Sequence, residues 1–265
     1  MSAFVSSSQL RKHERFRSRF LRNQRDIVVY LPPGYDDQVS QRFPILYMHD
    51  GQNLFDGATS FVPGMDWRVG QTADRLIESG AIQPLIIVGI YNTGKSRIQE
   101  YTPTKAPKLG GGRADRYAKF LLQELMPFIQ NEYRVLQGPS VTGIGGSSLG
   151  GLVSLYIGLQ NPLVFGKIAA LSPSVWWHQR AIHRFAANLN PEPRARIWLD
   201  IGTREGPRIV QDVERFRDVL LEKGWQLGKD LHYQRVEGAE HNEAAWADRV
   251  APFLQFLYPA SLPRD

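Results

Sequence analysis

The 265-residue sequence contains no cysteine and no long apolar run. Without cysteine there is no disulfide framework, no cysteine-ligated zinc or iron–sulfur site and no cysteine nucleophile. A membrane span needs about 18 consecutive apolar residues, so no membrane partner is expected. The N-terminal residues lack the apolar core of a secretory signal. The cytoplasm is therefore the default compartment, and secretion is the alternative if a leader has been removed.

The rest of the composition is typical of a globular protein that has one basic region. Hydrophobic residues make up 42% and charged residues 22% of the chain, which excludes a disordered chain, a collagen and a coiled-coil rod. The formal net charge is +6, and many of the positive side chains lie in residues 11–25, interleaved with Phe16 and Phe20. This pattern favours an edge strand, where Lys and Arg discourage pairing with other sheets. Because the sequence has no RNA-binding or helix-turn-helix motif, we expect no nucleic-acid partner.

Strand-like and helix-like segments alternate along the chain. Strands are predicted at residues 26–31, 44–49, 84–90, 141–146, 166–171, 196–202 and 231–236, with an edge strand at 14–20. Helices are predicted at about 66–79, 113–133, 149–160, 207–223 and 242–257. Several strands are apolar throughout, as in a parallel sheet that is covered on both faces. We therefore expect a single α/β domain over residues 1–265, with 1–12 as a loose N-terminal arm and 92–112 as a long loop.

A glycine-rich turn follows the predicted strand 141–146. Residues 145–151 read GGSSLGG, and only Gly146, Ser148 and Gly150 fit the G-x-S-x-G pattern. In this pattern the serine sits on a sharp strand-to-helix turn, where larger side chains two residues away would collide. Both common phosphate-loop patterns are absent. The sequence therefore predicts that Ser148 is a nucleophile.

A serine nucleophile needs a neighbouring base, which in turn is held by a carboxylate. In sheet enzymes that carry this turn, the acid and then the histidine follow the serine along the chain. Among six histidines, His241 has this position, because it lies in a loop between the last predicted strand and the last predicted helix. Glu205 lies just past the preceding strand, whereas Asp200 lies within it. We favour Glu205 as the acid and keep Asp200 as the alternative.

Two backbone N–H groups are expected to form an oxyanion hole. One should belong to Leu149, the residue after the nucleophile, and the other to the turn after strand 44–49, which reads His-Asp-Gly-Gln-Asn. Gly51 lets the backbone approach closely in that turn. Gln52 is the predicted second donor.

Seven stretches together resemble the putative-esterase family of α/β-hydrolases. This family includes enterochelin esterases, feruloyl and acetyl-xylan esterases, S-formylglutathione hydrolases and mycolyltransferases. The stretches are residues 29–35, 46–55, 100–103, 145–151, 171–177, 200–205 and 241–243 with Trp246, in the family's order. The resemblance implies an α/β-hydrolase fold with an approximately eight-stranded, mostly parallel sheet and helices on both faces. It also implies a triad of Ser148, Glu205 and His241, although the family often has Asp at the acid position.

Four further residues are predicted to contact substrate because they follow strands at the carboxyl edge of the sheet. Arg97 and Tyr101 follow strand 84–90, and Trp176 and Trp177 follow strand 166–171. An Arg could hold an anion and a Trp could stack on a sugar or aryl ring. Packing in the protein interior is the alternative role for each of them. The sequence has no long insertion between predicted strands that could form a large lid, so an open site is expected.

These observations predict a serine carboxylic-ester hydrolase that works through an acyl-enzyme. The expected substrates are acetyl or aryl (feruloyl-type) esters of carbohydrates, or small esters. A siderophore trilactone esterase of the enterochelin type and an acyltransferase are alternatives, whereas the intact Ser, acid and His disfavour a non-enzymatic binding protein. No cofactor and no metal is expected. The oligomeric state is left open.

Overall fold

The computed structural model describes residues 8–37, 39–190 and 192–260. Residues 1–7 of the predicted N-terminal arm lie outside this description. Residues 9–12 are not loose, because they begin the first strand, which pairs antiparallel with the second from Gln9 to Ser18. The edge strand therefore starts earlier than the predicted residues 14–20.

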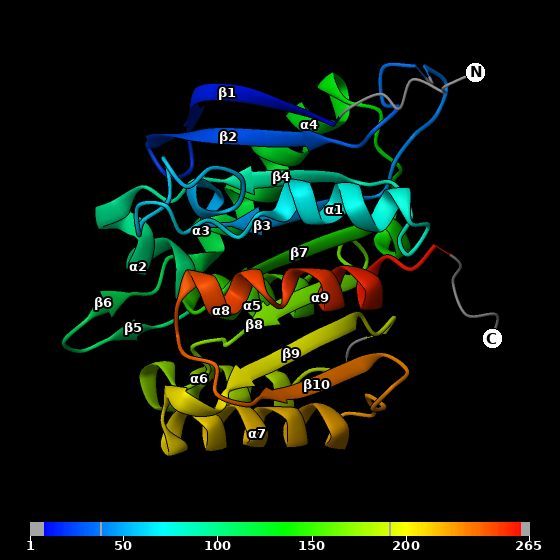
Figure 1. The fold of residues 1–265 in the computed structure, drawn as a ribbon. Helices are drawn as coiled ribbons and strands as arrows, with labels where there is room; N and C mark the ends of the chain where they lie inside the picture. The colour runs from blue at the N-terminus through cyan, green and yellow to red at the C-terminus, as the bar shows by residue number, and fades with distance from the viewer. Residues whose placement is uncertain (1–7, 38, 191, 261–265) are drawn as a thin grey trace.

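An eight-stranded sheet forms the centre of the molecule (Figure 1). In sheet order its strands are β1 (Gln9–Ser18), β2 (Asn23–Leu31), β4 (Ile86–Ile90), β3 (Ile45–His49), β7 (Thr142–Ser147), β8 (Lys167–Leu171), β9 (Arg196–Gly202) and β10 (Leu231–Val236). The pairs β1–β2 and β2–β4 are antiparallel, and all the others are parallel. The predicted fold class, a mostly parallel α/β sheet of about eight strands, is confirmed.

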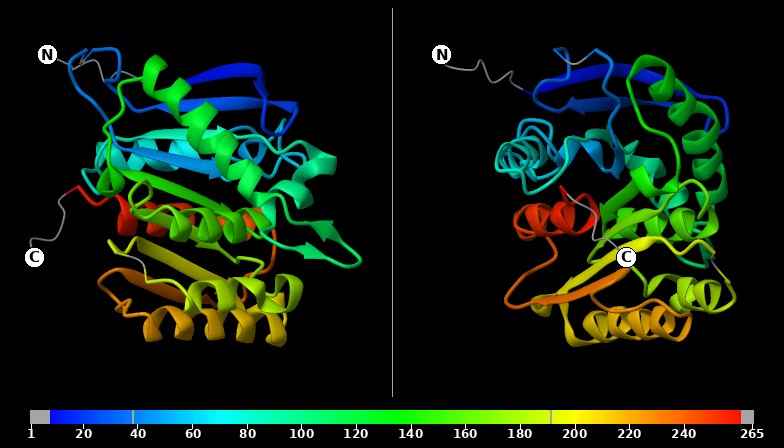
Figure 2. Two further views of the ribbon diagram at one scale, coloured as in Figure 1. Left: turned by 180° about the vertical axis from the view of Figure 1, so that it is seen from behind. Right: turned by 90° about the vertical axis from the view of Figure 1, so that its right-hand side faces the viewer.

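Helices cover both faces of the sheet (Figure 2). On one face lie α1 (Val69–Glu78) and α9 (Val250–Leu257), whose apolar residues share a core with Leu46 and Met48 of β3. On the other face lie α3 (Ala114–Phe120), α4 (Met126–Glu132), α5 (Leu149–Gln160), α6 (Trp177–Ala187) and α7 (Pro207–Glu222). The five residues of β3 are all buried, as are those of β4 and β8. Burial on both faces explains why these strands are apolar except for His49 and Lys167 at strand ends.

The structure differs from the predicted elements in three places. The predicted helix 242–257 is divided into α8 (Glu243–Ala247) and α9. The predicted long loop 92–112 contains α2 (Arg97–Tyr101) and a small hairpin of β5 (Lys105–Ala106) and β6 (Gly110–Gly111). Helix α6 was not among the predicted helices. A five-residue helix and two-residue strands are too short to produce a recognisable sequence period.

Within the described residues, no helix combines the length and the apolar character that crossing a bilayer would require. The parallel strands β3, β4, β7, β8, β9 and β10 all end at the same edge of the sheet. The segments after these six strands therefore begin at one edge of the sheet, and they hold the residues predicted for the site.

Candidate active site

Ser148 stands on a strained turn between β7 and α5. Its backbone has φ 57° and ψ −124°, a conformation that residues with side chains rarely adopt. A Cβ on Gly146 would lie 3.0 Å from the carbonyl carbon of Gly150, and a Cβ on Gly150 would lie 3.2 Å from the carboxylate of Asp50. Both glycines are therefore needed so that the chain can turn sharply and present the Ser148 hydroxyl at the sheet edge.

The structure brings His241 to this serine. His241 lies in the loop between β10 and α8, and its Nε2 is 3.0 Å from Ser148 Oγ. The imidazole is 42% exposed. One side of the ring is supported by the indole of Trp246, which lies edge-on with its centroid 4.9 Å away. The sequence pattern pointed to Trp246 only through the family resemblance, without a role.

Glu205 lies on the other side of His241. It ends a short turn after β9, and its Oε2 is 2.6 Å from His241 Nδ1. Its second oxygen accepts hydrogen bonds from the Ser172 hydroxyl at 2.5 Å and from the Gly202 N–H at 2.9 Å. Burial by itself raises the pKa of Glu205, but the hydrogen bonds from His241, Ser172 and Gly202 together lower it below its ordinary value. Glu205 is therefore a carboxylate at neutral pH.

An ionised Glu205 determines which nitrogen of His241 carries the proton. A carboxylate can only accept hydrogen bonds, so Nδ1 must donate. The lone pair of Nε2 then faces Ser148 Oγ, which is the tautomer that can receive the serine proton. The three side chains form a hydrogen-bonded chain that comes from three separate strand ends.

Asp200, the alternative acid, does not reach His241. Its carboxylate accepts hydrogen bonds from Arg249 Nη1 at 2.6 Å, Trp198 Nε1 at 2.7 Å and the backbone N–H of Ser172 at 3.0 Å. Asp200 lies within β9, in a sheet whose faces are covered by helices, and it is completely buried. This geometry favours Glu205 over Asp200 as the candidate acid.

Arg249 and Ser172 were not singled out from the sequence, yet both support the acid. Arg249 lies between α8 and α9 and is almost fully buried. Its Nη1 donates to the Ser172 hydroxyl at 2.8 Å, and that hydroxyl donates to Glu205. Arg249 interrupts a largely apolar helical stretch at the break between α8 and α9. A charged residue at such a break is the sequence signal that could have pointed to it.

The two predicted oxyanion donors lie at neighbouring strand ends. Leu149 is the first residue of α5, so its N–H has no partner within the helix. Gln52 follows β3 and lines the cavity in front of Ser148. In the turn between β3 and Gln52, Asp50 has a left-handed backbone with φ 56°, and a Cβ on Gly51 would overlap the backbone of Gly89. The turn is therefore pressed closely onto β4.

Arg97 holds this turn through Asp50. Its Nε and Nη2 each donate to the Asp50 carboxylate at 2.8 Å, and Asn92 Nδ2 donates to it at 2.7 Å. Burial opposes the charged form of Arg97, but ionised Asp50 keeps its pKa above the usual value. Arg97, a predicted substrate contact, borders the cavity, but its guanidinium is engaged with Asp50. Asp50 was missed because a strand-end Asp beside a glycine resembles an ordinary turn residue.

The other predicted substrate contacts do not line this cavity. Tyr101 is completely buried beneath Arg97, whose guanidinium lies 5.2 Å from its ring centroid. Trp177 is also buried, and its Nε1 donates to the backbone carbonyl of Thr104 at 2.9 Å. Trp176 is partly exposed but is not among the cavity residues. Tyr101 and Trp177 therefore have packing roles, the alternative that their sequence positions left open.

A cavity of about 900 Å³ lies in front of the serine. Apolar and aromatic side chains from three regions line part of it: Phe61, Val62, Tyr91 and Trp246. Its acidic and basic residues other than His241 are Asp50, Arg97 and Glu243. In the described part of the chain, no group of three or more His, Asp or Glu side chains could hold a metal ion.

Comparisons with known proteins place the chain among esterases. An uncharacterized protein of Bacillus subtilis (strain 168), YbbA, is 29% identical over 248 residues, which cover 88% of this chain and 92% of that protein. An endo-1,4-beta-xylanase/feruloyl esterase of Xylanibacter ruminicola is 27% identical over 87% of this chain and 29% of that protein. An iron(III) salmochelin esterase of Escherichia coli is 30% identical over 76% of this chain and 47% of that protein.

Solved structures share the fold. The BES protein of Bacillus cereus superposes with a TM-score of 0.75 at 21% identity, covering 97% of each chain. A ferulic acid esterase gives a TM-score of 0.75 at 19% identity, covering 95% of this chain and 98% of the other. A sequence model of one family, described as putative esterase, matches residues 18–257. The chain therefore belongs to the putative esterase family, whose members share the α/β-hydrolase fold.

Proposed function

We propose that this chain is a serine carboxylic-ester hydrolase with Ser148 as nucleophile, His241 as general base and Glu205 as the acid. The observation that carries the proposal is the pair of hydrogen bonds that joins them, 3.0 Å from His241 Nε2 to Ser148 Oγ and 2.6 Å from His241 Nδ1 to Glu205 Oε2. Membership of an esterase family supports the reaction class. We also propose that the chain acts as one domain, because a single sheet runs from β1 to β10.

The reaction proceeds in two halves. Ser148 Oγ attacks the ester carbonyl carbon while its proton passes to His241 Nε2, and Glu205 stabilises the resulting imidazolium. The tetrahedral intermediate collapses, the C–O bond to the alcohol breaks, and His241 returns the proton to the departing oxygen. Water then attacks the acyl-enzyme by the same proton path and releases the acid. The backbone N–H groups of Leu149 and Gln52 stabilise the oxyanion in both halves.

The cavity favours a neutral, partly aromatic ester. Phe61, Tyr91 and Trp246 offer faces against which an aryl acyl group or a sugar ring can pack. This supports feruloyl-type or acetyl esters of carbohydrates as substrates, as does the similarity to a protein named a xylanase/feruloyl esterase.

A siderophore trilactone is the second candidate, because another relative is named a salmochelin esterase. A ferric catecholate carries several negative charges. The cavity contains two carboxylates, Asp50 and Glu243, and one guanidinium, that of Arg97. Asp50 already neutralises this guanidinium. This balance of charge argues for the neutral ester.

The test combines activity with chemical labelling. Wild-type protein should hydrolyse p-nitrophenyl acetate and should be labelled by a fluorophosphonate on the peptide that contains Ser148. Ser148→Ala should lose both properties while keeping the wild-type melting temperature, with activity reduced by about 10⁵-fold or more. Full activity in Ser148→Ala, or labelling at another serine, would refute the mechanism. A panel of feruloyl, acetyl-sugar and catecholate esters then ranks the substrate classes.

A further inference from the structure

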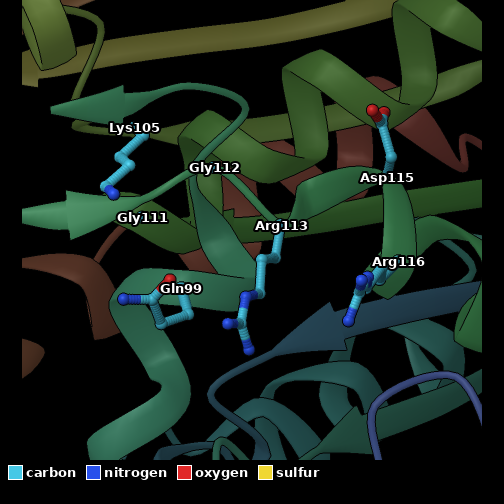
Figure 3. Close-up of a pocket in the computed structure, with 7 residues that line it drawn as sticks. All are labelled: Gln99, Lys105, Gly111, Gly112, Arg113, Asp115 and Arg116. Atoms are coloured by element: carbon cyan, nitrogen blue, oxygen red, sulfur yellow. The ribbon is translucent and has the colours of Figure 1, made fainter.

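A second set of cavities lies on the other side of α2 from the active site. Arg97 of this helix lines the active-site cavity, whereas Gln99 lines a cavity of about 500 Å³ beside the β5–β6 hairpin. Lys105, Arg113 and Arg116 contribute to this second cavity, and Figure 3 shows Gln99 and Arg113 side by side there. A basic site thus adjoins the proposed catalytic centre, separated from it by one short helix.

The cavity continues toward the turn between β1 and β2. A small pocket shares Gln99, Arg113 and Arg116 with it and also contains Asn23. Asn23 in turn lines a third cavity of about 420 Å³, together with Arg17 and Arg22. The β1–β2 turn, α2 and the β5–β6 hairpin lie on the same side of the molecule (Figure 1). We call this continuous surface the basic groove and define it by its five cationic residues, Arg17, Arg22, Lys105, Arg113 and Arg116.

The cations of the basic groove outnumber its anions. Within the described residues, none of its five cationic side chains forms a hydrogen bond or an ion pair. Of the two carboxylates that line these cavities, Glu100 is bound by Arg25 at 2.9 Å. Asp115 keeps its negative charge, because its hydrogen-bond donor, the Tyr156 hydroxyl at 2.7 Å, is neutral. The groove therefore faces solvent with a net positive charge.

We propose that the basic groove binds the carbohydrate chain that carries the ester, and that this chain is acidic, with uronic-acid carboxylates along it. The inference rests on the proposed esterase function and names the substrate class of that site. The cations are spread over three adjoining cavities, which suits single charges spaced along a polymer better than one compact polyanion. A polymer held there would place an ester-bearing residue near α2, whose Arg97 lines the active-site cavity.

The neutral side chains of the groove support a sugar chain over a nucleic acid. The amides of Gln24 and Gln99 lie between the cations and make no side-chain hydrogen bond in the described structure, so both can pair with sugar hydroxyls. Single-stranded nucleic acids need aromatic platforms on which bases stack. Among the described residues that line its three cavities, the one aromatic residue, Phe20, is half-buried.

The test compares acetyl esters with no carbohydrate carrier, a neutral carrier and an acidic carrier. Its substrates are p-nitrophenyl acetate, an acetylated neutral xylo-oligosaccharide and an acetylated oligogalacturonate. For the double variant Arg113→Gln/Arg116→Gln, KM for the oligogalacturonate should rise about fivefold or more at low salt, because exposed ion pairs are individually weak but additive. The difference should shrink at high salt. The other two substrates should be hydrolysed as by wild type.

A matched control removes two positive charges elsewhere. Arg208→Gln/Lys229→Gln changes two exposed cations at the β9–β10 side of the molecule and should leave all three KM values unchanged. Calorimetry with unesterified oligogalacturonate measures binding without catalysis, and the groove variant should bind it more weakly than the control does.

Several outcomes would overturn the groove proposal. One is an unchanged KM for the acidic substrate in an active enzyme. Another is an equal change in the control variant. A third is competition by a single-stranded DNA oligonucleotide when oligogalacturonate does not compete. A protein that binds oligogalacturonate through Arg113 and Arg116 but hydrolyses no ester would instead contradict the proposed function alone.

Discussion

The active-site cavity and the basic groove lie on opposite sides of α2 and differ in how their charges are arranged. In the active-site cavity, Arg97 is bound to Asp50 and His241 to Glu205, each through contacts of 2.6–2.8 Å. In the basic groove, side chains such as Arg113 have no charged partner within the described residues. Paired charges hold a side chain in one geometry, as the proposed chemistry requires. Cationic side chains without a charged partner remain free to bind an anion. Removing a charge should therefore have a large effect in the first region and a small one in the second.

The largest effect should come from Glu205. Glu205→Gln keeps the shape of the side chain but no longer stabilises the imidazolium, and kcat should fall about 10³–10⁴-fold. Stopped assays with p-nitrophenyl acetate measure this change, and circular dichroism checks the fold. A loss of less than tenfold would mean that another group holds His241.

Asp200, which lies in the strand just before the Glu205 turn, should affect stability more than catalysis. Asp200→Asn leaves the buried Arg249 guanidinium without its full counter-charge, so the free energy of unfolding should drop by about 3 kcal/mol. Urea unfolding measures this loss. The kcat of the folded protein should stay well above that of Glu205→Gln. An unchanged unfolding free energy, or an equal loss of kcat, would contradict the separate roles that we assign to the two carboxylates.

Asp50 should have an intermediate effect on catalysis. Asp50→Asn weakens the hold of Arg97 on the turn that presents the Gln52 N–H, so kcat should fall about 10- to 100-fold while KM changes little. Arg97→Lys keeps the charge but loses the two-point contact, and its kcat should lie between those of Asp50→Asn and wild type. If KM rose instead and kcat stayed constant, Arg97 would bind substrate directly, as the sequence suggested.

The smallest effect concerns pH. The native pKa of Glu205 is lower than its ordinary value of 4.5, so its ionised form stabilises the fold above that pH. This stabilisation is lost as the pH falls through the lowered native pKa. The melting temperature of Glu205→Gln should therefore depend less on pH than that of wild type in this acidic range. The melting temperature of the groove variant Arg113→Gln/Arg116→Gln should depend on pH as that of wild type does. A weaker pH dependence in that variant would contradict the difference that we draw between the two regions.

Much of the fold could be read from the sequence because buried parallel strands are apolar throughout and amphipathic helices separate them. The residues of β3, β4 and β8 carry this pattern except for His49 and Lys167 at strand ends. Elements without a period were missed, such as α2 and the β5–β6 hairpin. The same limit applied to the substrate contacts, since a strand-end position does not reveal whether Tyr101 or Trp177 points into a cavity or into the core.

The sequence by itself determined the sharp turn at Ser148, the proposed nucleophile, because Gly146 and Gly150 satisfy a local steric requirement. It also indicated His241 and Glu205 through their order after predicted strands. Only the tertiary structure gives a reason to propose Glu205 and not Asp200 as the acid, because the choice depends on which carboxylate lies 2.6 Å from an imidazole 36 positions away. Likewise, only the tertiary structure shows that Arg113 and Arg116 have no charged partner among the described residues. Composition states the net charge of +6, but only the packing of distant segments determines which charges find partners.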